Sequence, residues 1–302
     1  MTAATAAASA PAGSAATARQ RAELLAASFP PLMVAAERVA STVAQGVHGR
    51  RRVGSGYAFW QFRQYQPGDP STRIDWRQSA KTQRLFIRET EWEAAQSVWL
   101  WCDSSASMDY RSTNALPTKH ERATILMMAL ASLLVRGGEH IALLGRDRVP
   151  YTGQNAMLRL AETLVRIGRA DLSVPQPVRI PRHARVVLFG DFLAPLAEVD
   201  GLVCAYGADD VDGHLVQVLD PVEEEFPFAG RTEFRGFEDE GRVLLDRVQT
   251  VRADYLGRLR EHRQGLSDIA RAAGWTFLPH RTDRSPQTAL LALYQGMSDD
   301  WI

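Results

Sequence analysis

The 302-residue sequence predicts an α/β fold with a doubly wound, mostly parallel sheet and a smaller mixed α/β N-terminal elaboration. Two observations carry this prediction. Short apolar runs from residue 97 onward lack polar alternation, which is typical of strands that are covered on both faces. Segments with helical apolar spacing separate these runs, and parallel strands need such crossover connections.

The first 94 residues are predicted to lie outside this sheet. Residues 1–18 are rich in alanine, serine and threonine and predict a disordered tail. Residues 19–94 predict N-terminal helices followed by a small β elaboration, because the apolar spacing changes from helical to roughly alternating. In chain order, the expected elements are helices at 19–27 and 32–45, a loop at 46–56, a strand at 57–65, a turn at 67–69 and a strand at 85–88.

Residues 95–302 predict the α/β domain itself. Apolar runs predict strands at 97–103, 140–145, 184–191, 213–220 and 275–279. Helical spacing predicts helices at 121–135, 155–167, 196–206, 248–273 and 286–297. Residues 221–247 lack a long helical pattern, and two short apolar segments flank an acidic turn within them. A β-hairpin insertion is therefore predicted near 221–247.

Composition and charge exclude some functions. The 35 Lys and Arg residues balance 35 Asp and Glu residues, so no basic excess exists to attract nucleic acid. No apolar stretch approaches the roughly 18 residues that a membrane-spanning helix requires. The two cysteines, Cys102 and Cys204, lack the spacing of a zinc site or a disulfide framework. These features predict a cytoplasmic protein with no transmembrane segment and no nucleic-acid partner.

Two of the predicted strands end in an acidic residue. Asp103 follows one apolar run and Asp191 follows another. Ser105 and Ser107 come after Asp103, so one tight loop can point three oxygens at a common centre, which Asp191 can reach directly or through water. Oxygen ligands of this kind suit Mg²⁺ or Mn²⁺. A serine after a strand can instead cap the next helix, but the second strand-terminal aspartate favours a metal site.

Two stretches of the sequence resemble known families. DSSASM, at 103–108, resembles the metal-ion-dependent adhesion site of von Willebrand factor A domains. Residues 62–93 resemble the signature of the bacterial family called domain of unknown function 58, and the resemblance to this family runs from roughly residue 45 to the end of the chain. The resemblance implies a von Willebrand factor A-like domain. The matching signature residues are Arg63, Tyr65, Gly68, Asp69, Arg73, Ile74, Asp75, Trp76, Ser79, Ala80, Arg88 and Glu89.

The resemblance to an adhesion site also implies how an ion would be held. Such a site adds a threonine from a second loop, where this sequence offers Ser173 as a weak substitute and Asp171 as a rival. Asp191 matches the later acidic position of the site. The resemblance further implies an open coordination position that an Asp or Glu of a partner closes, so that metal and partner bind cooperatively.

The resembled family also implies a partner. Its members are often encoded beside MoxR-type AAA+ ATPases, which implies a role as an adaptor or co-chaperone in complex assembly or envelope stress. We therefore expect a non-enzymatic, divalent-metal-dependent protein-interaction module.

Two other functions are compatible with the same residues. The first is a Mg²⁺-dependent phosphoryl-transfer enzyme, with Asp103 as nucleophile and Asp191 as a second metal ligand. Aspartyl phosphatases carry a second Asp where this sequence has Ser105, and the sequence offers no downstream strand-linked lysine to hold a phosphate. The second is a scaffold that binds no metal.

The upstream signature admits two interpretations. Its arginines and carboxylates can form ion pairs that fix the small N-terminal region to the sheet, with Trp76 as a core anchor. We favour this interpretation, because arginine–carboxylate pairs commonly serve such a role. In the alternative, Trp76 or Arg73 is exposed as the centre of a partner-recognition face.

Overall fold

The computed structural model describes residues 34–44, 53–66, 74–81, 84–91, 97–166, 173–236 and 241–299. It divides the chain into two compact units, Met1–Val43 with Ser97–Ile302, and Ala44–Gln96. The helix at 34–44 therefore lies mostly within the first unit, whereas the sequence prediction grouped residues 19–94 together. Predictions for the tail, for a helix at 19–27 and for a turn at 67–69 lie outside the described residues.

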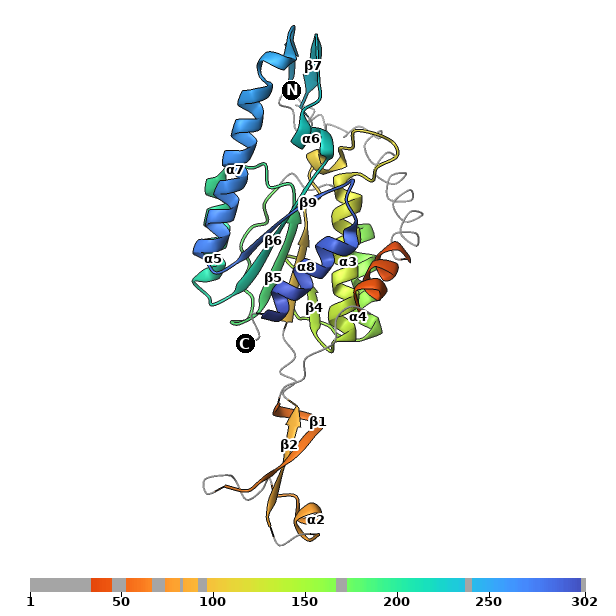
Figure 1. Cartoon of the computed structure of the whole chain (residues 1–302), viewed down its shortest axis with the longest axis vertical. Coiled ribbons are helices and arrows are strands. Elements are labelled where there is room, and N and C mark those ends of the chain that lie inside the picture. The colour runs from red at the N-terminus through yellow and green to blue at the C-terminus, as the bar shows by residue number, and fades with distance from the viewer. Residues whose placement is uncertain are drawn as a thin grey trace, which may run out of the picture. The chain divides into compact units, whose positions relative to one another are not determined.

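A five-stranded parallel sheet forms the centre of the first unit (Figure 1). Its strands, in spatial order, are β4 (His140–Leu143), β3 (Ser97–Cys102), β5 (Arg185–Gly190), β6 (Asp212–Leu219) and β9 (Thr276–Arg281). An isolated antiparallel bridge between Ile141 and Tyr151 lies beside β4. All six residues of β5 are buried, as expected of a strand that is covered on both faces. The predicted mostly parallel α/β architecture is confirmed.

The strand order reverses between β3 and β5, which are neighbours in the sheet although β4 lies between them in the chain. Cys102 at the end of β3 is in register with Phe189 near the end of β5. The next backbone N–H, that of Asp103, donates to the carbonyl of Phe189 at 2.8 Å. In open α/β sheets such a reversal at the carboxyl ends of the strands is where ligands bind.

Helices flank this sheet. They are α3 (Lys119–Arg136), α4 (Gln154–Arg166), α5 (Leu196–Gly207), α7 (Arg252–Ala272) and α8 (Pro286–Asp299). α5 packs against α7, whereas α3 packs against both α4 and α8, and Figure 1 shows the two groups on opposite sides of the sheet. None of the helices in the described ranges combines the length and apolar character that crossing a membrane requires.

Close packing under α5 and α7 depends on small residues. Trp275, just before β9, is buried against Tyr206 of α5, with the two rings stacked and their centroids 6.3 Å apart. A Cβ atom at Gly213 would lie 2.2 Å from the indole ring of Trp275, and one at Gly265 would lie 2.4 Å from Leu196. The lack of a side chain at Gly213 therefore lets the Trp275 ring lie against β6, and that at Gly265 leaves room for Leu196 between α5 and α7.

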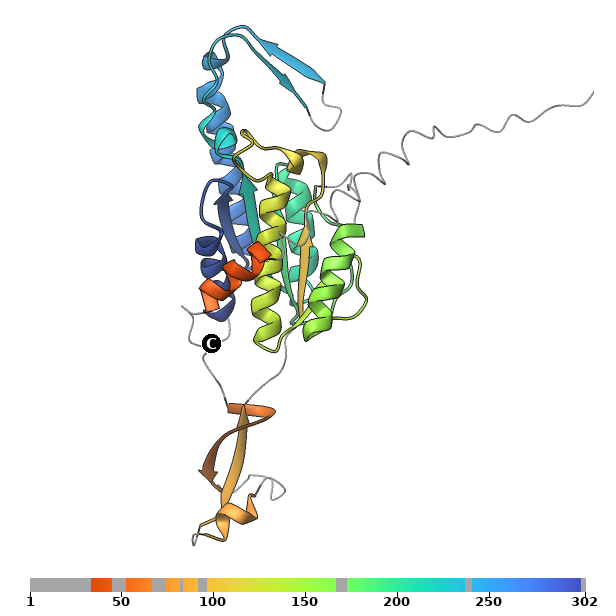
Figure 2. The same cartoon turned by 90° about the vertical axis from the view of Figure 1, so that its right-hand side faces the viewer.

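An insertion follows β6. It consists of α6 (Pro221–Glu225) and an antiparallel pair, β7 (Thr232–Arg235) and β8 (Arg242–Leu245), which Figure 2 shows as a projecting hairpin. Phe226 stacks on Tyr255 of α7 with ring centroids 4.4 Å apart and on Phe234 of β7 at 5.6 Å, so an aromatic cluster ties the hairpin to α7. A short 3₁₀ turn, η3 (Val248–Thr250), leads into α7. The predicted β-hairpin is confirmed.

The second unit contains a separate antiparallel pair, β1 (Val53–Gln64) and β2 (Phe86–Glu91), with the short helix α2 (Trp76–Ser79) between them in the chain. β1 begins at Val53, so part of the predicted loop at 46–56 is strand. The side chain of Asp75 caps α2 by accepting the backbone N–H of Gln78 at 2.8 Å. Ile74 and Ile87 bridge the helix start to β2 and are both buried.

Candidate metal site at the carboxyl edge of the sheet

Two buried aspartates lie side by side where β3 and β5 end. Asp103 follows β3 with 0 % exposure, and Asp191 follows β5 with 1 % exposure. A Cβ atom at Gly190 would lie 3.1 Å from Cβ of Asp103, which is tighter than ordinary packing. The missing side chain of Gly190 therefore allows the two loops to approach closely.

Two serine hydroxyls complete the cluster. Oδ1 of Asp103 accepts the backbone N–H of Ser105 at 2.8 Å, which folds the loop back over the strand end. The hydroxyls of Ser105 and Ser107 are hydrogen-bonded at 3.1 Å, and that of Ser107 donates to Oδ2 of Asp191 at 2.7 Å. Ser107 belongs to a short 3₁₀ helix, η2 (Ala106–Asp109). The structure thus brings together all four residues that the sequence singled out as strong metal ligands.

Of the two weaker candidates, the structure describes Ser173 alone. Ser173 makes no hydrogen bond to Asp103, Ser105, Ser107 or Asp191 within the part of the chain that the structure describes. Asp171 lies outside the described residues. Among the described residues, the oxygens of the site therefore come from the loops that follow β3 and β5.

A buried lysine, which the sequence analysis missed, also contacts the cluster. Nζ of Lys119, the first residue of α3, lies 2.9 Å from Oδ2 of Asp191 and 2.7 Å from Oε1 of Glu223 in α6. The Lys119 side chain is 1 % exposed. Two further contacts hold the loops: His120 Nδ1 lies 2.9 Å from the carbonyl of Asp103, and Gln217 Nε2 donates to the carbonyl of Asp191 at 3.0 Å.

One signal in the sequence could have pointed to this residue. Lys81 and Lys119 are the only lysines in a chain that is otherwise rich in arginine. Thr118 and Glu121 also match the capping-box pattern, which places Lys119 at a helix start. Asp220 and Glu223 form a capping box as well, but no local pattern connects this insertion after β6 to the ends of β3 and β5.

Burial perturbs the ionisation of these groups. Burial, together with the negative charge of Asp191, raises the pKa of Asp103 to about 7. Burial lowers the pKa of Lys119, but the Asp191 and Glu223 carboxylates outweigh this effect and raise it above the ordinary lysine value. Burial also raises the pKa of Glu223, partly offset by Lys119. The cluster therefore holds negative charge that the protein itself compensates incompletely.

The donor set fits a hard divalent cation. Three carboxylates, on Asp103, Asp191 and Glu223, share the single positive charge of Lys119, which leaves two negative charges when all are ionised. Oδ2 of Asp103 is buried and has no hydrogen-bond partner. Across the described ranges, no group of three or more His, Cys, Asp and Glu side chains is arranged to hold a metal. The hydroxyls of Ser105 and Ser107 are therefore needed to complete an oxygen site.

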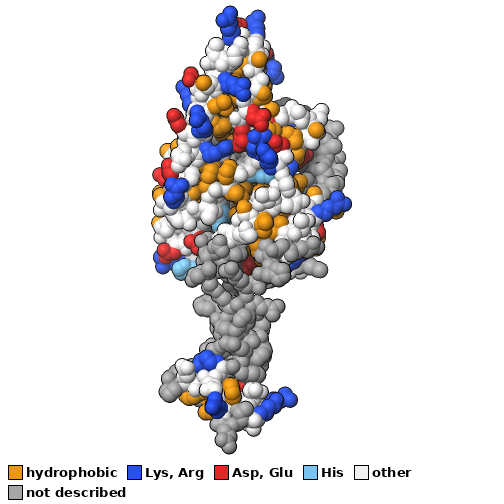
Figure 3. Space-filling model, viewed as in Figure 1, with side chains coloured by type: hydrophobic (Ala, Val, Ile, Leu, Met, Phe, Trp, Pro, Cys, Tyr) orange, Lys and Arg blue, Asp and Glu red, His pale blue; other side chains and the backbone are white. Residues whose placement is uncertain are grey.

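Charged side chains surround α6 at the rim of the site. Arg281, at the end of β9, lies 2.7 Å from Glu225 and 2.8 Å from Asp283, and Arg263 of α7 pairs with Glu224. Figure 3 shows acidic and basic side chains gathered in this region. Because these pairs are partly exposed, we assign them to fixing α6 rather than to chemistry.

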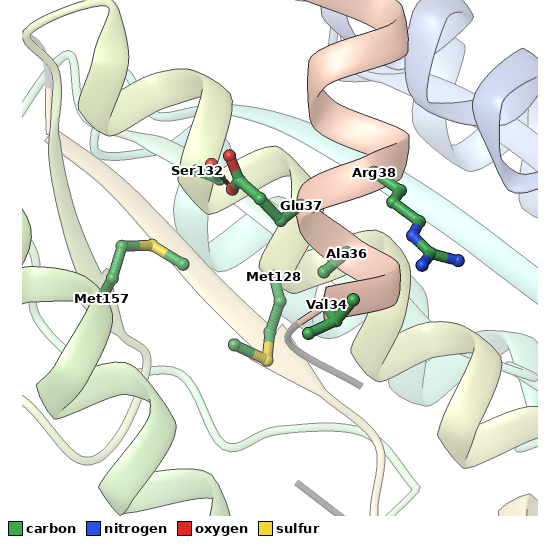
Figure 4. Close-up of a pocket in the computed structure, with 7 residues that line it drawn as sticks. All are labelled: Val34, Ala36, Glu37, Arg38, Met128, Ser132 and Met157. Carbon is green, nitrogen blue, oxygen red and sulfur yellow. Dashed lines mark hydrogen bonds between the residues drawn. The ribbon is translucent and has the colours of Figure 1, made fainter. Parts of the chain in front are cut away.

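A separate pocket of about 370 Å³ lies between the helix at 34–44, α3 and α4. Figure 4 shows Met128 and Met157 on the two sides of this space, with Val34 and Ala36 facing it. Its polar contact is a hydrogen bond from the Ser132 hydroxyl to Glu37 at 2.8 Å. The lining is mostly apolar and lacks a group of reactive side chains, so the site at the carboxyl edge of the sheet carries more chemical content.

The family-signature residues lie in the second unit. Within the second unit Trp76 is 65 % exposed, so it is not part of the core of that unit, and its predicted role in fixing this unit to the sheet stays a prediction. The helix α2 is a single turn whose buried residue is Ser79, which accepts the backbone N–H of Phe86 through its hydroxyl at 2.8 Å. Arg63 and Tyr65 are half-buried.

The remaining signature residues are only partly described. Arg88 and Glu89 lie in β2. Gly68, Asp69 and Arg73 lie outside the described residues. The predicted ion pairs among these residues therefore stay a prediction.

Comparison with other proteins gives relatives along most of the chain. The uncharacterized protein Rv1480 of Mycobacterium tuberculosis H37Rv is 29 % identical over 275 residues, which cover 86 % of this chain and 86 % of that protein. The uncharacterized protein Mb1516 of Mycobacterium bovis matches with the same identity and coverage.

Two solved structures resemble the fold more distantly. An aerotolerance-related membrane protein from Bacteroides fragilis matches 68 % of this chain and 100 % of that chain, with a TM-score of 0.40 and 16 % identity. BatB from Bacteroides thetaiotaomicron, described as a conserved hypothetical protein, covers the same shares with a TM-score of 0.39 and 13 % identity.

A family model described as "Protein of unknown function DUF58" matches residues 61–265. The match includes α2 with its exposed tryptophan, all four ligand candidates and the buried lysine. It spans more than half of the chain, and the chain therefore belongs to the DUF58 family.

Proposed function

We propose that this protein is a non-enzymatic, divalent-metal-dependent interaction module with a doubly wound, von Willebrand factor A-like sheet. In this proposal, Asp103, Ser105, Ser107 and Asp191 hold Mg²⁺ or Mn²⁺. The observation that carries the proposal is the buried Oδ2 oxygen of Asp103, which has no hydrogen-bond partner and lies in a cluster with an excess of negative charge. Burial of such an oxygen is costly unless a cation or a donor meets it.

The side chains divide the work of holding the ion. Asp103 and Asp191 supply negative charge from the two neighbouring strand ends, and the hydrogen bond from Ser105 N–H orients Asp103. The hydroxyls of Ser105 and Ser107 supply neutral oxygens between them. A bound divalent ion would offer its remaining coordination position to a carboxylate of the partner.

The partner is proposed from family resemblance. Because members of this family are often encoded beside MoxR-type AAA+ ATPases, we propose that such an ATPase, or a client that it remodels, provides the Asp or Glu that meets the ion. The protein would then act as an adaptor or co-chaperone. Its charge balance of 35 basic and 35 acidic residues gives no support to a nucleic-acid partner.

The arrangement supports phosphoryl transfer less well. Asp103 would be the nucleophile, but Ser105 stands where aspartyl phosphatases carry the second Asp that acts as acid and base. The sequence offers no downstream strand-linked lysine to hold a phosphate. The structure instead has Lys119, the first residue of a helix, at the site. Its ammonium, however, is already engaged by Asp191 and Glu223. An incoming phosphate would have to compete with both carboxylates.

Calorimetry on the full-length chain tests the proposal. We expect Mn²⁺ and Mg²⁺ to bind the wild type, Asp103→Asn to abolish this binding, and Asp209→Asn to leave it unchanged, since Asp209 is exposed on the turn after α5. Capture of the MoxR-type ATPase should then require the divalent ion and be lost with Asp103→Asn. Absence of binding heat for the wild type, both alone and with the ATPase present, would overturn the metal site in favour of a metal-free scaffold. A broad phosphatase screen with Mg²⁺ tests the enzymatic alternative.

A further inference from the structure

The charged side chain of Lys119 lies at a helix N-terminus and is buried, and both features are energetically unfavourable for a cation. Lys119 is the first residue of α3, directly after the N-cap Thr118. The helix dipole disfavours a cation at this end, and burial to 1 % exposure removes the hydration of the ammonium. Neither helix formation nor core packing explains a lysine here. Its carboxylate partners must therefore provide the compensation.

The Lys119 ammonium occupies an oxygen that the ion would need. Oδ2 of Asp191 accepts hydrogen bonds from Nζ of Lys119 at 2.9 Å and from the hydroxyl of Ser107 at 2.7 Å. A cation that binds between Asp103 and Asp191 therefore competes with an ammonium that is already part of the chain. The second oxygen of Asp191, Oδ1, accepts the backbone N–H of Leu193 at 3.2 Å.

Glu223 offers the ammonium a second, fixed acceptor. Its Oε1 lies 2.7 Å from Nζ of Lys119, while its Oε2 accepts the backbone N–H of Asp220 at 2.8 Å in the capping box of α6. The carbonyl of Glu223 also accepts the hydroxyl of Tyr255 at 2.9 Å. Glu223 is therefore held in place from two sides, whereas lysine has a flexible four-carbon stem.

From this geometry we infer that Lys119 is an intramolecular competitor of the divalent ion and sets its affinity. The ammonium neutralises Asp191 when no ion is bound, and it stays on Glu223 alone when the ion takes Asp191. This inference rests on the proposed function. Lys119 thus keeps the ion weakly bound until a partner carboxylate adds its own negative charge, which makes occupancy of the site dependent on the partner.

Two variants that break the same ion pair test this inference. Lys119→Met removes the competitor, and we expect the calorimetric affinity for Mn²⁺ to rise at least about tenfold, because a positive charge next to the ion is lost. Glu223→Gln leaves the ammonium with Asp191 as its ionised partner, so we expect weaker Mn²⁺ binding than in the wild type. Lys81→Met, which removes the exposed lysine of the second unit, should leave the affinity unchanged.

The possible outcomes separate this inference from the proposed function. If the wild type binds Mn²⁺ and Lys119→Met binds it equally or more weakly, Lys119 only positions Asp191 and the inference fails. If no variant binds Mn²⁺, the metal site itself fails. Should Lys119→Met not fold, the double variant Lys119→Met, Glu223→Gln replaces it, because it also removes the charge of Glu223, one of the two carboxylates that lose their lysine. The double variant must then bind Mn²⁺ more tightly than Glu223→Gln.

Discussion

The strand β5 has a buried charge at each of its ends, and the two ends are satisfied in different ways. At the amino end, Arg185 is 2 % exposed and donates a hydrogen bond to the backbone carbonyl of Met297, near the end of α8. Carbonyls at a helix end lack partners within the helix and carry partial negative charge. One contact of the buried charge at this end is therefore a backbone carbonyl at a helix end.

At the carboxyl end, the partners are side chains that can move. Asp191 is held by the Ser107 hydroxyl and the Lys119 ammonium, and its neighbour Asp103 keeps one buried oxygen without a hydrogen-bond partner. The difference teaches that burial of a charge does not by itself mark a functional site. A functional site is indicated where the buried charge exceeds the opposite charge and the hydrogen-bond partners that the chain itself provides.

Replacing Arg185 should have the largest effect on stability. Arg185→Met removes the donor to Met297 and leaves a buried carbonyl without its partner, so we expect the free energy of unfolding to fall by about 3 kcal/mol. Urea denaturation measures this loss, and calorimetry should show unchanged Mn²⁺ affinity. Arg182→Met is the control, because the Arg182 side chain is 70 % exposed. A loss of metal binding with Arg185→Met would contradict the division between the two ends.

The carboxyl end of this comparison could be predicted from the sequence, because it depends on local patterns, whereas the contact of Arg185 could not. The apolar runs before Asp103 and Asp191 predicted two strands covered on both faces, and parallel strands necessarily end at the same edge. The alternation of Ser105 and Ser107 after Asp103 gave the rest of the donor set. The structure has these four side chains in one cluster.

The parts that escaped prediction depend on distant contacts. Lys119 is 72 residues from Asp191 in the chain and 104 from Glu223, so no local periodicity connects them. Burial of a lysine also runs against the usual exposure of this residue type. Exposure of Trp76 within the second unit also departs from residue type, since a large aromatic side chain favours burial but a one-turn helix has too little surface to cover it.

Near the amino end of β5, the buried His214 is expected to make the stability of the fold sensitive to acid. Burial, and to a lesser degree the charge of Arg185, lowers the pKa of His214 from 6.5 to about 4. The unfolded chain therefore binds more protons than the folded chain between these values. The stabilisation is complete above pH 6.5 and is lost as the pH falls through about 4, with a total loss of about 3 kcal/mol. Urea denaturation at several pH values measures it.

The variant His214→Asn tests whether His214 causes this acid sensitivity. His214→Asn keeps a side-chain partner for the Thr276 hydroxyl, which lies 2.6 Å from Nδ1 of His214, and removes the titrating group. Its stability should fall less steeply between pH 6.5 and 4. Part of the sensitivity should remain, because burial also lowers the pKa of His280 to about 4. An unchanged pH profile would show that His214 is not a source of the effect.

At the carboxyl end of the strands, we expect a substitution to change the free energy of unfolding by a smaller amount and with the opposite sign. With a chelator present at pH 8, Asp103→Asn removes a buried charge that repels Asp191 and keeps an oxygen to accept the Ser105 N–H. We expect the free energy of unfolding to rise by about 1–2 kcal/mol, since a neutral side chain costs less to bury than a carboxylate without a partner.

Asp191→Asn provides the matched comparison for this change, because it weakens the ion pair with Lys119 and should lower stability under the same conditions. Both substitutions replace a buried aspartate with asparagine at neighbouring strand ends. If the free energy of unfolding rises for Asp103→Asn and falls for Asp191→Asn in urea denaturation, the chain compensates the charge of Asp191 and leaves that of Asp103 to a ligand. Destabilisation by both would mean that Asp103, too, is satisfied within the protein. The case for a ligand at this edge would then rest on calorimetry alone.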